Sequence, residues 1–166
     1  MIKLELLAKH FNNLGLNIFH TCNELSENNF KSSNILKHPY SNVSHLYTKK
    51  QKIDELNLID WEKIIGIGAI VGFENLRVID IDGCTNLEFI EDILDLLGLP
   101  KKYEWLIKSG SHDGYHIYIY CDKRDYAKDY NITSFQPNRN NIGLFEKFEF
   151  LWENTHAILP SSIHYS

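Results

Sequence analysis

The sequence predicts an α+β fold with a mostly antiparallel sheet. Three observations predict it: apolar residues recur at helical spacing in two segments, apolar runs of strand length fill the centre, and short polar turns separate several of those runs. The chain has 166 residues, of which 43% are hydrophobic and 23% are charged. This length allows a sizeable core in one compact domain, and the composition excludes wholesale disorder.

The first third of the chain is predicted to hold a helix, a strand and a long loop. Apolar residues recur at helical spacing from Leu4, and Gly15 predicts the end of that helix. A short apolar strand is expected over 16–19. The stretch 21–47 is rich in Asn, Ser and His and lacks periodicity, so we expect a long loop with short elements.

Two pairs of residues have the spacing of a capping box, in which a helix begins at a Ser or Thr followed three residues later by Glu or Gln. Thr48 and Gln51 predict the start of a short second helix. Thr85 and Glu88 predict a third helix over the segment LEFIEDILDLLG, which ends at Gly98.

The remaining elements are predicted to be strands. They are expected over 66–72, 76–82, 104–109, 115–121, 145–152 and 156–159. Short connections predict that the first two of these pair as a hairpin and that the last two form another hairpin. The polar stretch 122–141 is predicted to be loop.

Charge and cysteine content exclude several classes of protein. The formal net charge of -5 disfavours a general binder of phosphate backbones, whose affinity comes from Lys and Arg. Cys22, Cys84 and Cys121 are odd in number and form no CxxC pair, which indicates a reducing compartment. The N-terminus does not resemble a signal peptide and no run is long enough for a membrane helix. We therefore expect a cytoplasmic protein with no membrane segment.

Asp80 and Asp82 are the first candidate site residues. Side chains alternate along a strand, so these carboxylates share one face while Ile79 and Ile81 point to the other. Two like charges on one face are costly unless a cation lies between them, and Mg²⁺ prefers oxygen ligands. The alternative is a strand end that meets water before the turn at Gly83.

The turn between the strands at 104–109 and 115–121 is the second candidate. Lys108, Ser109, Ser111 and Gly114 make it small and rich in donors, so its backbone could approach a phosphate closely. His116 follows on the strand, where its ring can contact a phosphate oxygen or transfer a proton. The alternative is an ordinary glycine hairpin beside an exposed histidine.

Aromatic residues on the strand at 145–152 single out a third candidate, Glu149. Phe148 and Phe150 alternate with it, so the aromatic rings should face the core and Glu149 the opposite side. A lone glutamate on such a strand is usually only solvated. Glu149 is a candidate only because Asp80, Asp82 and His116 are candidates as well.

In order along the chain, the segments RVIDIDG, SGSHDGYHIYIY and FEFLWENTHAILPSSIH carry these candidates. This order resembles the primase–polymerase (prim-pol) branch of the archaeo-eukaryotic primase superfamily, whose members carry an hhhDhD/E strand, a Ser/Gly-x-His motif and a strand carboxylate. The resemblance implies an N-terminal αβ unit over 1–65 and an RRM-like catalytic part over 66–166. It also implies a fragment of a longer replication protein, with a possible helicase domain.

The resemblance also implies the chemistry. Asp80, Asp82 and Glu149 would hold two divalent ions, Mg²⁺ or Mn²⁺, and His116 with Gly114 would contact the triphosphate of an incoming NTP or dNTP. The implied activity is template-directed nucleotidyl transfer, which makes or extends primers on single-stranded DNA or a primer–template in a replication complex. His112 is a rival to His116, and the position of Gly114 and the alternation in HIYIY favour His116. Glu153 is a rival to Glu149, and the aromatic alternation favours Glu149.

Three other interpretations stay open from the sequence. The chain could bind nucleotides or nucleic acid on the same fold without turnover, or it could be a metal-dependent nuclease or phosphodiesterase. A zinc site at His20, Cys22, His38 and His45 is disfavoured, because their spacing matches no zinc motif. A tyrosine beside His116, either Tyr118 or Tyr120, is a candidate for stacking on a base.

Overall fold

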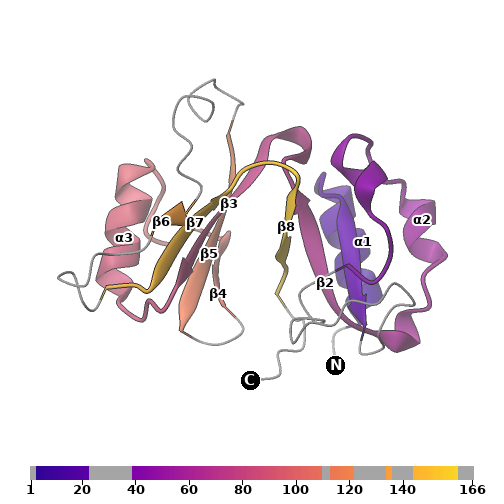
Figure 1. Ribbon diagram of the computed structural model, residues 1–166, viewed down its shortest axis with the longest axis horizontal. Helices are drawn as coiled ribbons and strands as arrows, with labels where there is room; N and C mark the ends of the chain where they lie inside the picture. The colour runs from indigo at the N-terminus through magenta and orange to yellow at the C-terminus, as the bar shows by residue number, and fades with distance from the viewer. Residues whose placement is uncertain (1–2, 23–38, 110–112, 122–133, 136–143, 161–166) are drawn as a thin grey trace. The chain divides into compact units, whose positions relative to one another are not determined.

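The computed structural model describes residues 3–22, 39–109, 113–121, 134–135 and 144–160. They form an α+β fold with two antiparallel sheets, which confirms the predicted fold class at this level (Figure 1). The chain divides into two compact units. Unit 1 comprises Met1–Leu76 and Glu153–Ser166, and unit 2 comprises Arg77–Trp152.

Unit 1 has a three-stranded sheet with β2 at its centre. The strands are β1 (Ile18–Cys22), β2 (Ile64–Val71) and β8 (Thr155–Ile158), in the order β1-β2-β8. Its helices are α1 (Leu4–Asn13) and α2 (Ile53–Asn57), with short 3₁₀ turns η2 (Ser44–Tyr47), η3 (Trp61–Lys63) and η4 (Phe73–Asn75). The predicted first helix is therefore confirmed, whereas the strand after it forms at Ile18–Cys22 and not at 16–19. The segment predicted to be a long loop with short elements contains η2, and residues 23–38 of that segment lie outside the described residues.

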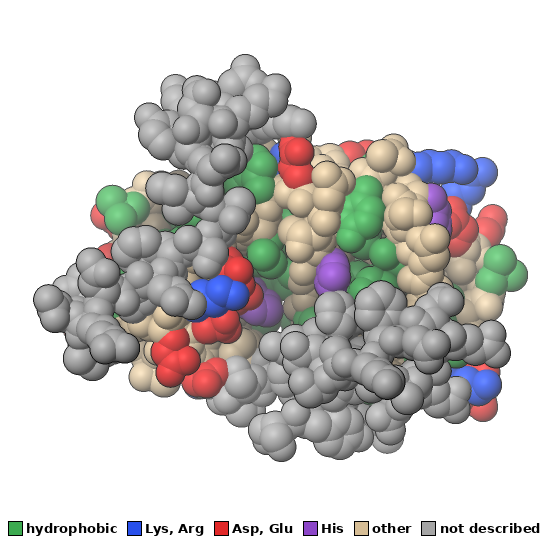
Figure 2. Space-filling view, viewed as in Figure 1, with side chains coloured by type: hydrophobic (Ala, Val, Ile, Leu, Met, Phe, Trp, Pro, Cys, Tyr) green, Lys and Arg blue, Asp and Glu red, His purple; other side chains and the backbone are tan. Residues whose placement is uncertain are grey.

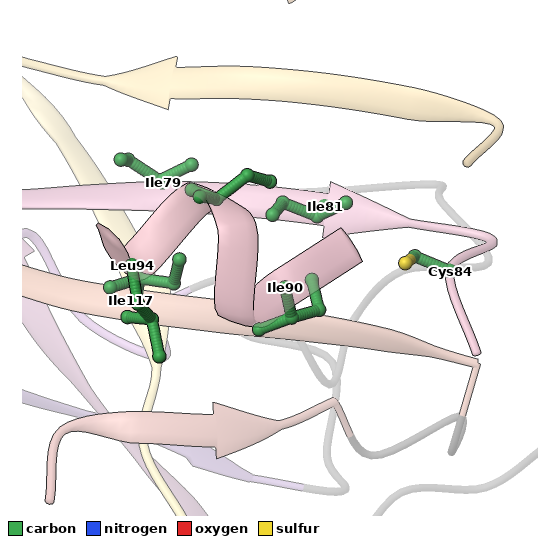
Figure 3. Packing of buried hydrophobic residues seen from close by; sticks show 7 residues of the cluster. Ile79, Ile81, Cys84, Ile90, Leu94 and Ile117 are labelled. Atoms are coloured by element: carbon green, nitrogen blue, oxygen red, sulfur yellow. The ribbon is translucent and has the colours of Figure 1, made fainter. Parts of the chain in front are cut away.

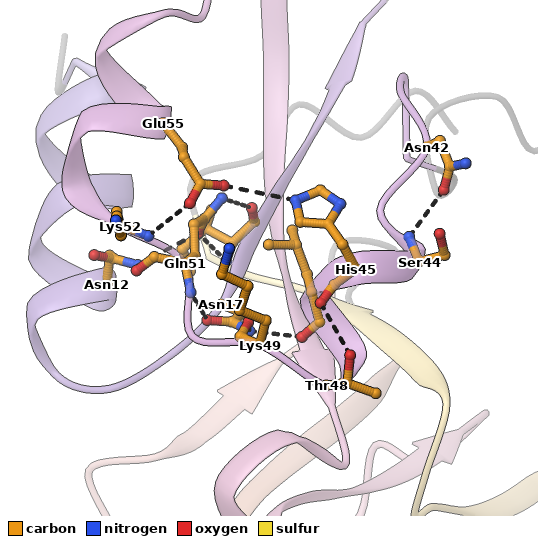
Figure 4. A network of polar contacts seen from close by, with 12 residues as sticks. Asn12, Asn17, Asn42, Ser44, His45, Thr48, Lys49, Gln51, Lys52 and Glu55 are labelled. Carbon is orange, nitrogen blue, oxygen red and sulfur yellow. Dashed lines mark hydrogen bonds and ion pairs between the residues drawn. The ribbon is translucent and has the colours of Figure 1, made fainter.

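Buried amide side chains fasten β1 to the segment that precedes α2 (Figure 4). Asn17 Nδ2 donates to the carbonyl oxygens of Leu46 at 2.6 Å and Lys49 at 2.8 Å, and Asn17 Oδ1 accepts from the backbone N of Gln51 at 2.8 Å. The Gln51 side chain bonds to both backbone groups of Ile18, at 2.7 Å and 2.9 Å. Gln51 thus replaces a strand neighbour at this edge.

Both predicted capping boxes are wrong. The side chain of Gln51 is committed to β1, and α2 begins after Lys52, whose backbone N donates to Glu55 Oε1 at 3.0 Å. The third helix, α3 (Leu87–Leu96), has Asn86 as its N-cap, and Asn86 Oδ1 accepts from the backbone N of Phe89 at 3.3 Å. In each case the helix begins later than the pattern predicted, because a different side chain reaches the free backbone donors.

The described residues of unit 2 form a five-stranded sheet and α3. The strands are β3 (Leu76–Asp82), β4 (Leu106–Lys108), β5 (Gly114–Tyr120), β6 (Ser134–Phe135) and β7 (Lys147–Leu151), in the order β4-β5-β3-β7-β6. Apolar side chains of α3 and of the sheet form a buried cluster (Figure 3). Its buried members are Ile79, Ile81, Cys84, Ile90, Ile93, Leu94 and Ile117. One face of the sheet is therefore committed to the core.

Both predicted hairpins are wrong. β2 pairs with β1 and β8, whereas β3 lies between β5 and β7, so the strands at 66–72 and 76–82 belong to different sheets. For the same reason β7 and β8 do not pair. The short connection after β2 holds residues with positive φ, Gly72 at 101°, Glu74 at 44° and Asn75 at 66°, and it leads from one sheet into the other. Within the part of the chain that the structure describes, no helix is long and apolar enough to cross a membrane.

Candidate metal and nucleotide site

The pairing of β3 with β7 places the candidate carboxylates together. Asp80 lies directly opposite Glu149 in the register, and Asp82 lies opposite Lys147. Directly opposed side chains of an antiparallel pair project from the same face. Ile79 and Ile81 project from the other face into the core beneath α3, which confirms the predicted alternation.

The three carboxylates form one cluster. Asp80, Asp82 and Glu149 each offer an oxygen, and these atoms all lie within 4.8 Å of one another. Among the described residues, no other group of His, Cys, Asp or Glu side chains meets the same condition. In the space-filling view, acidic side chains gather beside a basic side chain and a histidine (Figure 2).

The environment of Asp80 fits a bound cation. Its Oδ1 atom is buried and has no hydrogen-bond partner among the described residues. The Nε2 atom of His116 lies 3.2 Å away, but the pair does not have the geometry of a hydrogen bond. A buried carboxylate oxygen without a partner is costly, and a divalent cation would satisfy it.

His116 comes from β5, the strand next to β3. Its side chain is 17% exposed, against 20% for that of Asp80, so both lie at the edge of solvent. The ring of Tyr118 lies against His116 at 6.2 Å between centroids. Burial, together with the negative charge of Asp80, raises the pKa of the Tyr118 phenol and keeps it protonated.

Lys147 is a residue of the site that our reading of the sequence missed. Its Nζ atom lies 2.7 Å from Glu149 Oε2. That contact raises the pKa of Lys147, with further contributions from the charges of Asp82 and Asp80. The sequence did contain a signal for Lys147. It lies two residues before Glu149 on the same strand, and side chains two residues apart on a strand project from the same face.

The turn before β5 reaches the Asp82 end of β3. The backbone N of Ser109 donates to Gly114 O at 2.8 Å, which closes the turn. A Cβ atom added to Gly114 would lie 2.5 Å from Ile81 O, 3.2 Å from Ser109 Oγ and 3.3 Å from Asp82 Cα. Only a residue without a side chain allows this approach, so Gly114 lies against the backbone of β3 at Ile81 and Asp82.

Other candidates are not brought to the cluster. Lys108 pairs with Tyr115, whose ring packs against the core beneath α3, so the register places Lys108 on the opposite face from His116. Ser111 lies outside the described residues. Tyr118 is only 1% exposed and has no free face for a base, whereas Tyr120 is 55% exposed.

No protein-family model matches the chain, and no curated protein matches its sequence.

Proposed function

We propose that the chain is a metal-dependent, template-directed nucleotidyltransferase of the prim-pol type, which makes or extends primers in DNA replication. The observation that carries the proposal is the convergence of Asp80, Asp82 and Glu149, with the ring of His116 in contact distance of Asp80. Residues far apart in the sequence meet on one sheet face in the order that the resemblance requires.

The order of the strands supports the proposal. In an RRM-like sheet the first and third strands of the unit lie side by side at the centre, with helices on one face. Here β3 and β5 are adjacent in the order β4-β5-β3-β7, and α3 packs on one face. The acidic residues and His116 lie on these strands and on β7, on the face away from α3.

The residues of the site suit phosphoryl transfer. Mg²⁺ or Mn²⁺ ions held by the three carboxylates would neutralise the attacking 3′-oxygen and the leaving pyrophosphate. His116, at the rim of the cluster, would donate a hydrogen bond to the triphosphate. Such positioning supplies most of the catalysis in this class of reaction.

The test is primer extension on a primed single-stranded DNA template with Mn²⁺ or Mg²⁺ and nucleotides. The variant Asp80→Asn/Asp82→Asn keeps the size of both side chains and removes two metal ligands. Its rate should fall at least about a hundredfold, because loss of a residue that only orients a metal ligand already costs about ten- to a hundredfold. Asp92→Asn/Asp95→Asn is the matched control. It makes the same change of charge on the exposed surface of α3 and should retain the activity.

One observation favours a second candidate function, a nucleotide-binding module without turnover: Glu149 is already paired with Lys147. That candidate predicts nucleotide binding by the unmodified protein with no release of pyrophosphate. Full activity of Asp80→Asn/Asp82→Asn would contradict the metal site itself, and shortened DNA in the absence of nucleotides would indicate a nuclease.

A further inference from the structure

Lys147 lies among the three carboxylates and has no place in the proposed reaction. Its Nζ atom is 2.7 Å from Glu149 Oε2, and the register sets it directly opposite Asp82. The side chains of Lys147 and Glu149 are 36% and 26% exposed, so the contact is only partly open to solvent. The ammonium group therefore stands where a bound cation would have to approach Glu149.

The charges of this face explain why a lysine is held there. Three carboxylates whose oxygens lie within 4.8 Å of one another repel each other strongly when no cation is present. An ammonium group on a flexible stem can neutralise part of that charge and can also leave without unfolding the strand. A divalent cation needs the same oxygen of Glu149 or its neighbour, so the two cations compete.

We propose that Lys147 is a tethered cation that occupies the acidic cluster in the metal-free protein and releases Glu149 when divalent ions bind. The inference rests on the proposed metal site and deepens it. Lys147 acts as a positioning residue: it holds the carboxylates together before metal binding, and it sets the metal concentration at which the site fills.

The experiment is a Mn²⁺ titration of the full chain, with free Mn²⁺ followed by electron paramagnetic resonance. Lys147→Met keeps the aliphatic stem and removes the charge. We expect its dissociation constant for Mn²⁺ to fall roughly three- to thirtyfold, because the metal no longer displaces a charged hydrogen-bond partner. Lys147→Arg keeps the charge and should bind Mn²⁺ no more tightly than the unmodified protein.

The control is Lys101→Met. Lys101 Nζ lies 2.6 Å from Glu91 Oε2 in another lysine–glutamate pair of unit 2, whose glutamate lies on α3 rather than in the cluster. This variant makes the same change of net charge and should leave Mn²⁺ affinity unchanged. If Lys147→Met does not fold, Lys147→Gln gives the same comparison.

A second readout is thermal unfolding. Without metal, Lys147→Met should unfold at a lower temperature than the unmodified protein, and saturating Mn²⁺ should reduce that difference. Equal Mn²⁺ affinity of Lys147→Met and the unmodified protein would overturn the inference and leave the proposed function standing. Tighter binding by Lys147→Arg as well would also overturn it, since charge would not be the cause. If neither protein bound Mn²⁺, both the inference and the proposed function would fall.

Discussion

Gly114 shows at the scale of one residue how the site depends on close packing. A side chain at this position would meet the backbone of β3 at Ile81 and Asp82. We predict that Gly114→Ala lowers the free energy of unfolding by about 1–3 kcal/mol, the usual cost of overpacking. Because β5 must move away from β3, Mn²⁺ affinity should fall as well, and chemical denaturation with a Mn²⁺ titration measures both.

Gly98 provides the contrast for that prediction. It has a φ of 70°, and an added Cβ would meet nothing within 4 Å. Gly98→Ala is therefore strained in its backbone but free of collisions, so it should cost stability and leave Mn²⁺ affinity unchanged. A loss of affinity in Gly98→Ala equal to that in Gly114→Ala would mean that general destabilisation, and not the approach of β5 to β3, affects the site.

At the scale of the element, β1 depends on side-chain amides as well as on its strand neighbour. Gln51→Ala removes both hydrogen bonds to the backbone of Ile18 and leaves those buried groups without partners. We predict a loss of about 2–3 kcal/mol in the free energy of unfolding. Urea denaturation measures it. Asn57→Ala, which removes an exposed hydrogen bond to Asp54, should change stability by less than about 0.5 kcal/mol.

The two wrong hairpins show that strands could be located from the sequence but that their pairing could not. Alternation and apolar runs located most of the strands, because burial of one face leaves a trace in the sequence. The partners of those strands left no such trace. β2 and β3 follow each other closely, yet each finds both of its neighbours elsewhere in the chain.

For the whole molecule, the division into two units predicts where metal binding acts. Mn²⁺ at 100 times its dissociation constant should stabilise the metal-bound state by about 2.7 kcal/mol. Hydrogen exchange should therefore slow in β3, β5 and β7, which carry the site, and should change little in β1 and β2. The variant Asp80→Asn/Asp82→Asn should show no slowing. Slowing confined to β1 and β2 would contradict the proposed location of the metal.

The sequence by itself determined the fold class, most of the helices and strands, and the faces on which Asp80, Asp82 and Glu149 lie, because alternation along a strand is a local property. It also singled out Gly114, whose missing side chain the approach of β5 to β3 requires. Only the tertiary structure decided that β3 pairs with β7, that Asp80 faces Glu149, and that Lys147 lies among the carboxylates. Those contacts join residues distant in the chain, and the hydrophobic pattern of either strand alone is compatible with several partners.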